Sequence, residues 1–583
     1  MIVRARLAAA SSTRLLAASA LVILLSIIPV HYAPAADSYE HAVVAADHAA
    51  ASAAGVEILK GGGNVVDAAV ATAFALSVVR PASSGVGGGG FMLIWDAQKR
   101  RALSIDYRER APAAATRDMF VDPRDPTKTL AGASERGHLA AAVPAQVAGL
   151  LFALREYGTS DLTTVLAPAL RLCRDGVIVD RHDMAVQKEV LGDFVKHPEY
   201  RQRFAVLYRL YANGGTPWRP GDRFHSPLTK LLERIAERGA DGFYRGEVAE
   251  AIVAEMRRGG GLISLEDLQS IQPTVRTALQ GEYGAFTIFT MPPPSSGGIG
   301  LLETLNILTA LGRQLPEAGI DKLAPDSPLF LHVLTESFKH AFADRAAWLG
   351  DADYAKVPIQ RLTSREYAEK LAAKIDLERT QPPAAYGGHA IPDDGGTSHF
   401  SILDAQGNAV ACTETINTHF GNYVVEPEFG IVLNNEMDDF TSLPGAPNAF
   451  GLVQSEANAI APGKRPLSSM TPTIAVRDGR AEFVVGASGG PRIITATTQV
   501  LLSRIRFGNS DPSIVEAHRI HHQWSPDRLD LEGPEWPAAE LEKLGHVLRV
   551  ANDHAVVQAA GRGADGKLWG ASDARKEGRA KGY

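Results

Sequence analysis

The residues that could do chemistry gather around Thr397, which follows Gly395 and Gly396 and opens a run rich in β-branched residues. A threonine hydroxyl is a weak nucleophile unless a base lies beside it, and a threonine at a chain terminus carries its own base, the α-amine. The pKa of that amine is near ~8 in a peptide, which suits a general base. We therefore hypothesise that the Thr397 hydroxyl attacks the Gly396 carbonyl and that water cleaves the resulting ester. For Gly-Gly-Thr alone, a plain surface hairpin is the alternative.

A second motif offers serine chemistry. Residues 486–490 read G-A-S-G-G and satisfy G-x-S-x-G between a predicted strand and a predicted helix, the context of a nucleophile elbow. Asp511 or Asp527, followed by His546 or His554, would complete the order of serine, acid and histidine. That fold requires a parallel sheet, whereas the strands predicted here are antiparallel, so Ser488 is the weaker candidate.

Two further motifs carry little weight. Residues 85–90 satisfy G-x-G-x-x-G, but they precede a predicted strand, whereas a dinucleotide-binding fingerprint follows one. A tight glycine turn that lets two backbone segments approach closely is the better interpretation. His518, His521 and His522 have the spacing of one helix face, but no carboxylate or cysteine of matching spacing joins them, so we predict no metal site.

Composition narrows the class of protein. The 583 residues carry a net charge of -7, with 45% hydrophobic and 21% charged residues, which describes a globular protein and argues against nucleic acid as a partner. Cys173 and Cys412 lie in apolar segments and are predicted to be buried thiols. Three arginines, an apolar run at 15–30 and small residues at 33–36 have the layout of a signal peptide. An uncleaved N-terminal anchor is the alternative; otherwise we expect a periplasmic or secreted protein with no membrane segment.

The elements that must position these residues mix helices with short strands. Helical spacing predicts helices at 42–60, 65–80, 144–157, 162–175, 184–195, 228–238, 248–258, 265–271, 299–311, 329–349, 492–506 and 537–544. Alternation predicts strands at 91–95, 102–107, 285–291, 397–403, 409–416, 430–433, 473–477, 482–486, 527–531, 547–551, 556–560 and 567–572. The pattern favours an α+β protein with antiparallel sheets. Residues 381–396, rich in proline and glycine, read as an exposed linker that ends at Thr397.

The chain as a whole resembles the γ-glutamyltransferase (γ-glutamyltranspeptidase) family of N-terminal-nucleophile hydrolases, from about Tyr39 to Tyr583. The resemblance rests on the blocks GGNVVDAAVA, GVGGGGFMLI, DYRERAP, PPPSSGG, GGTSHFSILDAQGNAVACTETINTHFG, GIVLNNEMDDF, KRPLSSMTPTI and GASGGPRIIT. It implies a four-layer αββα sandwich of two stacked antiparallel sheets between helices. It also implies a precursor cut between Gly396 and Thr397 into a large subunit, 37–396, and a small catalytic subunit, 397–583, which remain together as a heterodimer after removal of residues 1–36.

The resemblance also implies a role for each site residue. Thr397 matches the nucleophile, Thr415 the threonine whose hydroxyl contacts the new N-terminus, and Gly489 and Gly490 the backbone donors of the oxyanion hole. The groups that hold the α-carboxylate match Arg108, Ser468 and Ser469, and those around the α-ammonium match Asn417, Glu436 and Asp439. A guanidinium can take a carboxylate through two parallel hydrogen bonds, which a lysine cannot.

Three positions depart from the family pattern. Ser398 stands where many members have a second threonine, and Glu436 where some have glutamine. Phe450 stands where a tyrosine often sits in a lid loop resembling 444–451, which puts closure of that lid in doubt.

The resemblance therefore implies γ-glutamyl transfer from glutathione or another γ-glutamyl compound to water, an amino acid or a dipeptide, with no cofactor and no metal. A glutaryl-type (cephalosporin) acylase of the same superfamily is the alternative enzyme. An unprocessed binding protein is the alternative outside enzymes.

Overall fold

The computed structural model describes residues 37–386, 396–444, 448–449, 452, 454–551 and 555–583. The predicted signal peptide, most of the linker before Gly396, and the positions of Phe450 and His554 lie outside these residues. In the described part of the chain, none of the helices is both long enough and apolar enough to cross a membrane.

Two seven-stranded antiparallel sheets form the centre of the fold. The first sheet has, in spatial order, β1 (Ser38–Tyr39), β22 (Leu568–Ser572), β21 (Val556–Arg562), β17 (Arg480–Ser488), β16 (Thr473–Arg477), β11 (Phe286–Thr290) and β10 (Leu279–Tyr283). The second has β23 (Lys581–Gly582), β2 (Ala42–Ala46), β12 (Ser398–Asp404), β13 (Ala409–Thr415), β3 (Gly89–Asp96), β4 (Arg101–Tyr107) and β9 (Thr274–Arg276). Small sheets pair β14 (Val425–Glu426) with β15 (Ile431–Val432), β5 (Val121–Asp122) with β6 (Asp125–Thr129), β7 (Val177–Ile178) with β8 (Arg223–Phe224), and join β18 (Ile520–His521), β19 (Leu529–Glu532) and β20 (Leu548–Ala551).

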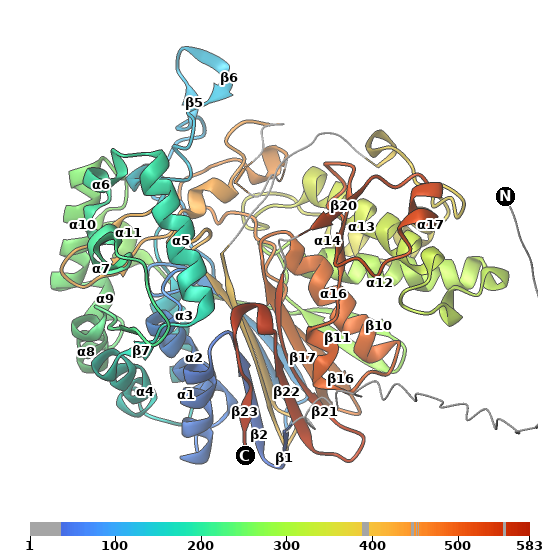
Figure 1. Cartoon of the computed structure of the whole chain (residues 1–583), viewed down its shortest axis with the longest axis horizontal. Coiled ribbons are helices and arrows are strands. Elements are labelled where there is room, and N and C mark those ends of the chain that lie inside the picture. The colour runs from blue at the N-terminus through green and yellow to red at the C-terminus, as the bar shows by residue number, and fades with distance from the viewer. Residues whose placement is uncertain (1–36, 387–395, 445–447, 450–451, 453, 552–554) are drawn as a thin grey trace, which may run out of the picture. The chain divides into compact units, whose positions relative to one another are not determined.

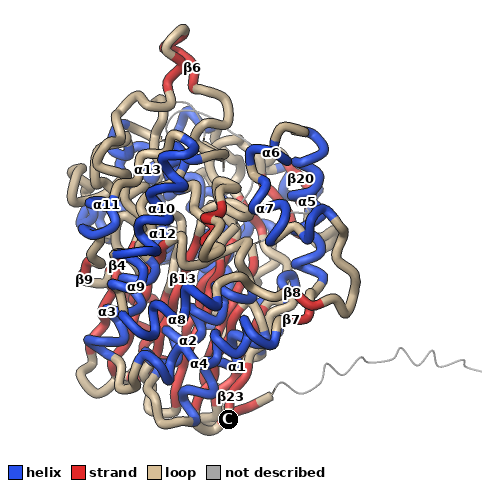
Figure 2. The backbone as a smooth tube through the Cα atoms, turned by 90° about the vertical axis from the view of Figure 1, so that its left-hand side faces the viewer, coloured by secondary structure: helices blue, strands red, loops and turns tan. Residues whose placement is uncertain are grey.

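Helices cover the outer face of each sheet, as Figure 1 shows. The layer on the second sheet contains α1 (Ala49–Lys60), α2 (Val65–Val79), α3 (Gln146–Tyr157), α4 (Leu162–Asp175), α5 (Arg181–Lys196), α6 (Tyr200–Arg203), α7 (Ala205–Leu210), α8 (Thr229–Arg238), α9 (Asp241–Tyr244), α10 (Gly246–Gly259) and α11 (Leu265–Ser270). On the side of the first sheet lie α12 (Gly297–Gln314), α13 (Pro328–Trp348), α14 (Ile359–Leu362), α15 (Arg365–Ala372), α16 (Arg492–Ile505) and α17 (Ala538–Lys543). Figure 2 looks onto the first of these two layers, with the strands behind it.

Three hydrophobic clusters separate the four layers. Alternate residues of one strand enter different clusters: Met92 and Ile94 face α1 to α4, whereas Leu93 and Trp95 face the other sheet. The inter-sheet cluster also contains Ile474 and other residues of the first sheet. Because the side chains of a strand alternate between its two faces, the period of two read from the sequence is what a strand buried on both sides requires. The predicted α+β class and αββα sandwich are confirmed.

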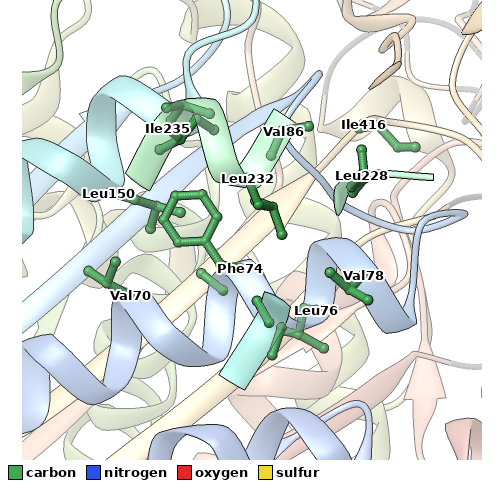
Figure 3. Packing of buried hydrophobic residues seen from close by; sticks show 14 of the residues in the cluster. Val70, Phe74, Leu76, Val78, Val86, Leu150, Leu228, Leu232, Ile235 and Ile416 are labelled. Carbon is green, nitrogen blue, oxygen red and sulfur yellow. The ribbon is translucent and has the colours of Figure 1, made fainter. Parts of the chain in front are cut away.

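Helix α2 is the most deeply buried helix of its layer. Asn64 caps it by accepting hydrogen bonds from the N–H groups of Val66 and Asp67, and the Asp67 carboxylate accepts one from the Asn64 backbone N–H, which completes a capping box. All of its residues are buried, and Phe74 lies among Val70, Leu150 and Leu232 in Figure 3. A helix surrounded in this way has no polar face, so its sequence looks uniformly apolar.

The hairpin predicted around Thr397 is confirmed. Strands β12 and β13 pair antiparallel with Ser398 opposite Glu414 and Leu403 opposite Ala409. They occupy the middle of the second sheet, between β2 and β3. This position buries the hairpin on both faces, so Thr397 begins a central strand of the sandwich and not a surface hairpin.

The main error of the sequence analysis concerns residues 42–60. Only Ala49–Lys60 is helical, whereas Ala42–Ala46 is the strand β2, which pairs with β12. Alanine has a high helix propensity, but pairing with a central strand overrides it. Strands β9 and β10 and helices α14 and α15 are further elements that the sequence pattern did not reveal.

The interpretations of the cysteines and of the glycine run are confirmed. Cys173 and Cys412 are buried free thiols. A Cβ added at Gly87 would lie 1.9 Å from the carbonyl oxygen of Val432, and one at Gly88 would lie 2.0 Å from that of Thr415. The glycine run therefore lets the loop before β3 pass directly against the end of β13.

Candidate active site

Thr397 lies buried at the point where the linker enters β12, and only 5% of its surface is exposed. Its hydroxyl donates a hydrogen bond to the carbonyl oxygen of Gly396, the residue before it. The Thr415 hydroxyl also donates to that oxygen, at 3.1 Å, and lies 3.2 Å from the Thr397 hydroxyl. The N–H of Gly396 donates to the Asn417 carbonyl at 3.0 Å. The uncut peptide is therefore held between two threonine hydroxyls and the end of β13.

This arrangement fits the first step of self-cleavage. The Thr397 hydroxyl oxygen is next to the carbonyl group that it would attack, and the Thr415 hydroxyl lies where negative charge would develop on the oxygen. The sequence analysis expected Thr415 to contact the new N-terminus; in the uncut chain it contacts Gly396 and Thr397.

Arg108 follows β4 and is fully enclosed by polar groups. Its Nη1 lies 2.7 Å from Glu436 Oε2 and 3.6 Å from Glu109 Oε2, and its Nη2 pairs with Asp439. The N–H of Arg108 donates to Asp106 Oδ1, and its Nε donates to the Pro466 carbonyl, which fixes the guanidinium plane. The residue predicted to hold an α-carboxylate thus forms ion pairs with two of the residues predicted to hold an α-ammonium.

Negative charge exceeds positive charge at Arg108. Burial raises the pKa of Glu109 to about 8, although Arg108 opposes the shift. Burial also raises the pKa values of Glu436 and Asp439, again against the attraction of Arg108. Ionising three buried carboxyl groups around one guanidinium is unfavourable in free energy, because their negative charges repel one another. A cationic ligand would reduce this unfavourable energy.

The loop that carries Ser468 and Ser469 is held by the segment around Ser295 and Ser296. Ser295 and Ser468 form a parallel bridge, Ser296 donates to the Ser468 carbonyl from both its N–H and its hydroxyl, and the Ser295 hydroxyl donates to Met470. Two sequence blocks 170 residues apart therefore build one rigid wall, and both predicted serines line the pocket in front of Thr397.

Gly489 and Gly490 follow β17 with φ values of 123° and 53°, which favour glycine. Within the described part of the chain, neither N–H donates a hydrogen bond to a backbone acceptor. Gly490 lines the pocket with Thr397. Two free donors in a left-handed turn can bind an anionic oxygen.

The pocket in front of Thr397 is narrow, with a volume of about 20 Å³. Of the predicted residues it brings together Arg108, Thr397, Thr415, Asn417, Asp439, Ser468, Ser469 and Gly490, with Glu436 behind them on Arg108. The pocket is closed on its other side by Arg345 of α13, with Leu452, Met470 and Ile493. The side-chain amide of Asn417 is fixed by donation to the Asn435 carbonyl at 3.0 Å.

Three charged residues of this region were missed by the sequence analysis. Arg345 is 3% exposed, its Nε donates to the Ser296 hydroxyl at 3.0 Å, and its Nη1 lacks a partner among the described residues. Burial lowers its pKa to about 10. Lys576 approaches Thr397 from the opposite side, and Glu109 adjoins Arg108. Arg345 lies in a mostly apolar helical segment, whereas Glu109 and Lys576 lie in polar stretches, so the sequence carries at most a weak signal for the first of them.

The rival motifs are not assembled. Ser488 ends β17 in an antiparallel sheet, and its hydroxyl accepts from Lys576 at 3.1 Å. His546, the predicted partner, instead shares a hydrogen bond of 2.8 Å with His332. His518, His521 and His522 lie on a strand and its flanks, and each contacts a different partner, Glu535, Thr495 and Asp527 respectively.

A different trio, His332, Glu336 and His546, has ligand atoms within 4.8 Å of one another. Its hydrogen bonds are already made: His332 also contacts the Asp376 carbonyl, and Glu336 accepts from Thr380 and Tyr386. A cluster with satisfied polar atoms needs no ion to explain it.

The chain is similar to known proteins over most of its length. The sequence matches the family model described as gamma-glutamyltranspeptidase over residues 51–583. It is 42% identical over 541 residues to the glutathione hydrolase proenzyme of Escherichia coli (strain K12), a match that covers 91% of this chain and 90% of that protein.

Two solved structures have a similar fold. The cephalosporin acylase from Bacillus halodurans superposes with a TM-score of 0.80 at 26% identity, covering 94% of this chain and 97% of that chain. The Helicobacter pylori gamma-glutamyltranspeptidase superposes with a TM-score of 0.51 at 36% identity, covering 57% of this chain and 92% of that chain.

Proposed function

The chain belongs to the γ-glutamyltranspeptidase family and is a γ-glutamyltransferase and glutathione hydrolase; we propose that it acts through Thr397 after cutting itself before that residue. The observation that carries the proposal is the Thr397 hydroxyl hydrogen-bonded to the Gly396 carbonyl, with the Thr415 hydroxyl on the same oxygen.

Self-cleavage is the first stage. The Thr397 oxygen adds to the Gly396 carbonyl carbon, its proton is transferred to the Thr397 nitrogen, and collapse of the adduct breaks the bond between the Gly396 carbon and that nitrogen. The resulting ester is hydrolysed by water, which leaves a Gly396 carboxylate and a free Thr397 α-amine. We expect subunits of 37–396 and 397–583. The match to the Helicobacter chain supports this division, because 92% of that chain covers only 57% of this one.

Binding of the γ-glutamyl donor is the second stage. In our proposal the donor's α-carboxylate lies against Arg108 and the hydroxyls of Ser468 and Ser469, and its α-ammonium lies among Asn417, Glu436 and Asp439. The ammonium supplies the positive charge that the carboxyl cluster around Arg108 lacks. Both ends of the zwitterion are then paired, which leaves the γ-carbonyl directed toward Thr397.

Transfer is the third stage. The α-amine takes the Thr397 hydroxyl proton, the oxygen adds to the γ-carbonyl carbon, and the N–H groups of Gly489 and Gly490 stabilise the oxyanion. The amide nitrogen leaves with the proton, giving a γ-glutamyl ester of Thr397. Water then releases glutamate, or an amino acid or dipeptide amine releases a new γ-glutamyl amide. This chemistry requires neither a metal nor an organic cofactor.

A glutaryl-type acylase is the second candidate, and the likeness to the cephalosporin acylase fold favours considering it. A glutaryl group has a carboxylate for Arg108 but lacks the α-ammonium. It would leave Glu109, Glu436 and Asp439 with one guanidinium between them. The charge balance of the pocket therefore favours the γ-glutamyl group.

Intact mass measurement of the purified wild type beside Thr397→Ala tests the proposal. We expect two chains that meet at Gly396 and Thr397 in the wild type, and one uncut chain in the variant. A variant that splits equally well, or a wild type that stays whole, contradicts it. Processed wild type should also hydrolyse a γ-glutamyl anilide faster than a glutaryl anilide, and Ser488→Ala should retain turnover if Ser488 is not the nucleophile.

Export is the last part of the proposal. The residues before 37 have the composition of a signal peptide, so we expect a mature protein that begins near residue 37 in the periplasm or outside the cell. N-terminal sequencing of protein from a cell fractionation tests this expectation.

A further inference from the structure

Behind Thr397, on the side away from the substrate pocket, lies a buried lysine that the reaction outlined above does not use. Lys576 follows β22 near the end of the chain and is 5% exposed. Its ammonium donates to three acceptors: the Thr397 carbonyl, the Ser488 hydroxyl at 3.1 Å and Asp47 Oδ2 at 3.0 Å. An ammonium has three protons, so all of its donor capacity is used.

The partners of Lys576 are themselves fixed. Asp47, between β2 and α1, is fully buried, and its other oxygen accepts from Gln558 of β21 at 2.7 Å. Arg80, at the end of α2, donates to the backbone carbonyls of both Asp47 and Lys576. The ammonium is therefore held by elements from the first 80 and the last 30 residues of the chain, and it cannot swing away from Thr397.

The other ionisable groups around this lysine are paired with one another or neutral, so the charges nearest the nucleophile are the Lys576 ammonium, which contacts the Thr397 carbonyl, and its counter-ion Asp47. Arg80 is balanced by Asp180 and Asp183 at the start of α5, while Asp573 pairs with Arg519 and Arg575. His48 and His182 are neutral, because burial lowers their pKa values. From the substrate side the charged groups that line the pocket are Arg108, Arg345 and Asp439. Asp47 is thus the one carboxylate bound directly to Lys576.

A charge in this position acts on the amine that forms when the chain is cut. The carbonyl that accepts from Lys576 and the new α-amine belong to the same residue, so they are separated by only two bonds through Cα. A second positive charge that close is disfavoured, more so in a buried site than in water. An α-amine that must accept a proton from the Thr397 hydroxyl is useful only in its neutral form.

We infer that Lys576 is a positioning residue for the nucleophile, which fixes the Thr397 carbonyl and keeps the new α-amine in its neutral, basic form at physiological pH. This inference rests on the proposed function, because it requires a processed N-terminal threonine. Ser488 has a supporting part: its hydroxyl orients the ammonium and carries no charge.

The test is the dependence of kcat on pH, measured with saturating γ-glutamyl anilide on fully processed enzyme. In Lys576→Met the acidic limb of the profile should move up by about one pH unit, a tenfold change in the proton affinity of the base. Lys576→Arg, which retains the charge, should leave the limb closer to its wild-type position. Lys581→Met, an exposed lysine of β23, is the matched control and should match the wild type.

Asp47→Asn provides an independent variant that moves the limb the other way. It removes the charge that balances Lys576 but retains an oxygen for the hydrogen bond, so the limb should move to lower pH. Ser488→Ala changes no charge and should not move it. If Lys576→Met is not processed, Asp47→Asn and Lys576→Arg still decide the question. An acidic limb that stays in place in Asp47→Asn, or in processed Lys576→Met, overturns the inference.

Failure of this inference can be separated from failure of the proposed function. If the wild type is not cut before Thr397 or does not turn over a γ-glutamyl anilide, the proposed function fails. If the wild type does both, but the acidic limb of the pH profile does not move when the charge of Asp47 or Lys576 is removed, only the role of Lys576 fails. Titration of the Thr397 α-amine, labelled with nitrogen-15 and followed by NMR, reports the same shift without turnover.

Discussion

The two sides of the pocket differ in how completely their polar atoms are bonded. On the nucleophile side, Thr397, Thr415 and Lys576 each have hydrogen-bond partners, and the described atoms without one, such as the Ser398 hydroxyl and Gln558 Oε1, belong to uncharged groups. On the binding side, the carboxyl groups of Glu109 and Glu436 meet Arg108 as ion pairs but have no hydrogen bond, and Nη1 of Arg345 also lacks one within the described chain.

This difference follows from when each side acts. The nucleophile side must act on the chain's own peptide before any substrate arrives, so folding alone must complete it. The binding side must exchange its internal ion pairs for those of a ligand, and buried polar atoms without partners are costly unless a ligand satisfies them. The charged groups that lack hydrogen bonds thus lie where the γ-glutamyl donor is expected to bind.

The largest expected effect that separates the two sides comes from Arg108→Gln. Removing the buried charge that pairs with the donor's α-carboxylate costs about 4 kcal/mol of binding free energy, so kcat/KM for a γ-glutamyl anilide should fall about 10³-fold. Processing should continue, because Arg108 has no hydrogen bond to Gly396 or Thr397. Steady-state kinetics and gel analysis measure the two effects. Arg117→Gln, which removes an exposed ion pair with Glu456, is the control; a loss below tenfold in Arg108→Gln would contradict the assignment.

Thr415→Val should have the next largest effect, and on the opposite side. Valine retains the shape of the side chain but cannot donate to the Gly396 carbonyl, and loss of one such donor typically costs ~10²-fold. The half-time of self-cleavage in purified precursor should lengthen by that factor. Thr415→Ser retains the hydroxyl and should process at a rate near that of the wild type. Equal rates for the valine and serine variants would show that the hydroxyl is dispensable.

The sequence predicted the nucleophile side well because its residues are contiguous. Thr397 and Thr415 belong to one hairpin, whose alternation and turn are local signals, and the register follows from them. The same alternation of residue types in the other strands predicted the fold class. Residues 42–46 were wrongly assigned to a helix because alanine has a high helix propensity. In the structure they form a strand because they pair with β12.

The residues of the binding side could be predicted from the sequence only in part. Arg108, Glu436, Asp439, Ser468 and Ser469 come from separate segments, and only their family resemblance indicated that they meet. Arg345 lies inside an otherwise ordinary helical pattern, and on the nucleophile side Lys576 lies in a polar C-terminal stretch, so nothing local distinguishes them from surface cations. Their burial is a consequence of tertiary packing, which a single sequence does not display.

Acid should destabilise the nucleophile side through His399. His399 of β12 is fully buried between Thr413 and Ser401, and burial lowers its pKa to about 3. An unfolded histidine has a pKa of ~6.5, so its stabilising contribution is present above that pH and is lost as the pH falls toward 3. Between pH 7 and pH 5 this residue should cost about 2 kcal/mol of the free energy of unfolding.

Urea unfolding of the uncut Thr397→Ala chain measures this effect without the complication of two subunits. Adding His399→Gln retains hydrogen-bonding atoms but removes the titrating ring, so the loss of stability between pH 7 and pH 5 should become smaller by about 2 kcal/mol. The histidines His340 and His546 shift in the same direction and remain in both proteins. An unchanged pH dependence would mean that His399 is protonated without cost.

The smallest expected effect concerns selectivity on the binding side. Asp439 pairs with Arg108 through one oxygen and accepts from Asn448 at 3.1 Å through the other. Asp439→Asn retains both positions but removes the charge that would face an α-ammonium. Because a hydrogen bond to a charged group is worth about 1.5 kcal/mol or more, the preference for a γ-glutamyl over a glutaryl anilide should fall about tenfold. Asp438→Asn is the matched control, since Asp438 accepts from Ser134 and Ala449 and faces away from Arg108. If both variants keep the wild-type preference, the excess of negative charge around Arg108 does not select the ammonium, and the γ-glutamyl and glutaryl groups would have to be told apart elsewhere in the pocket.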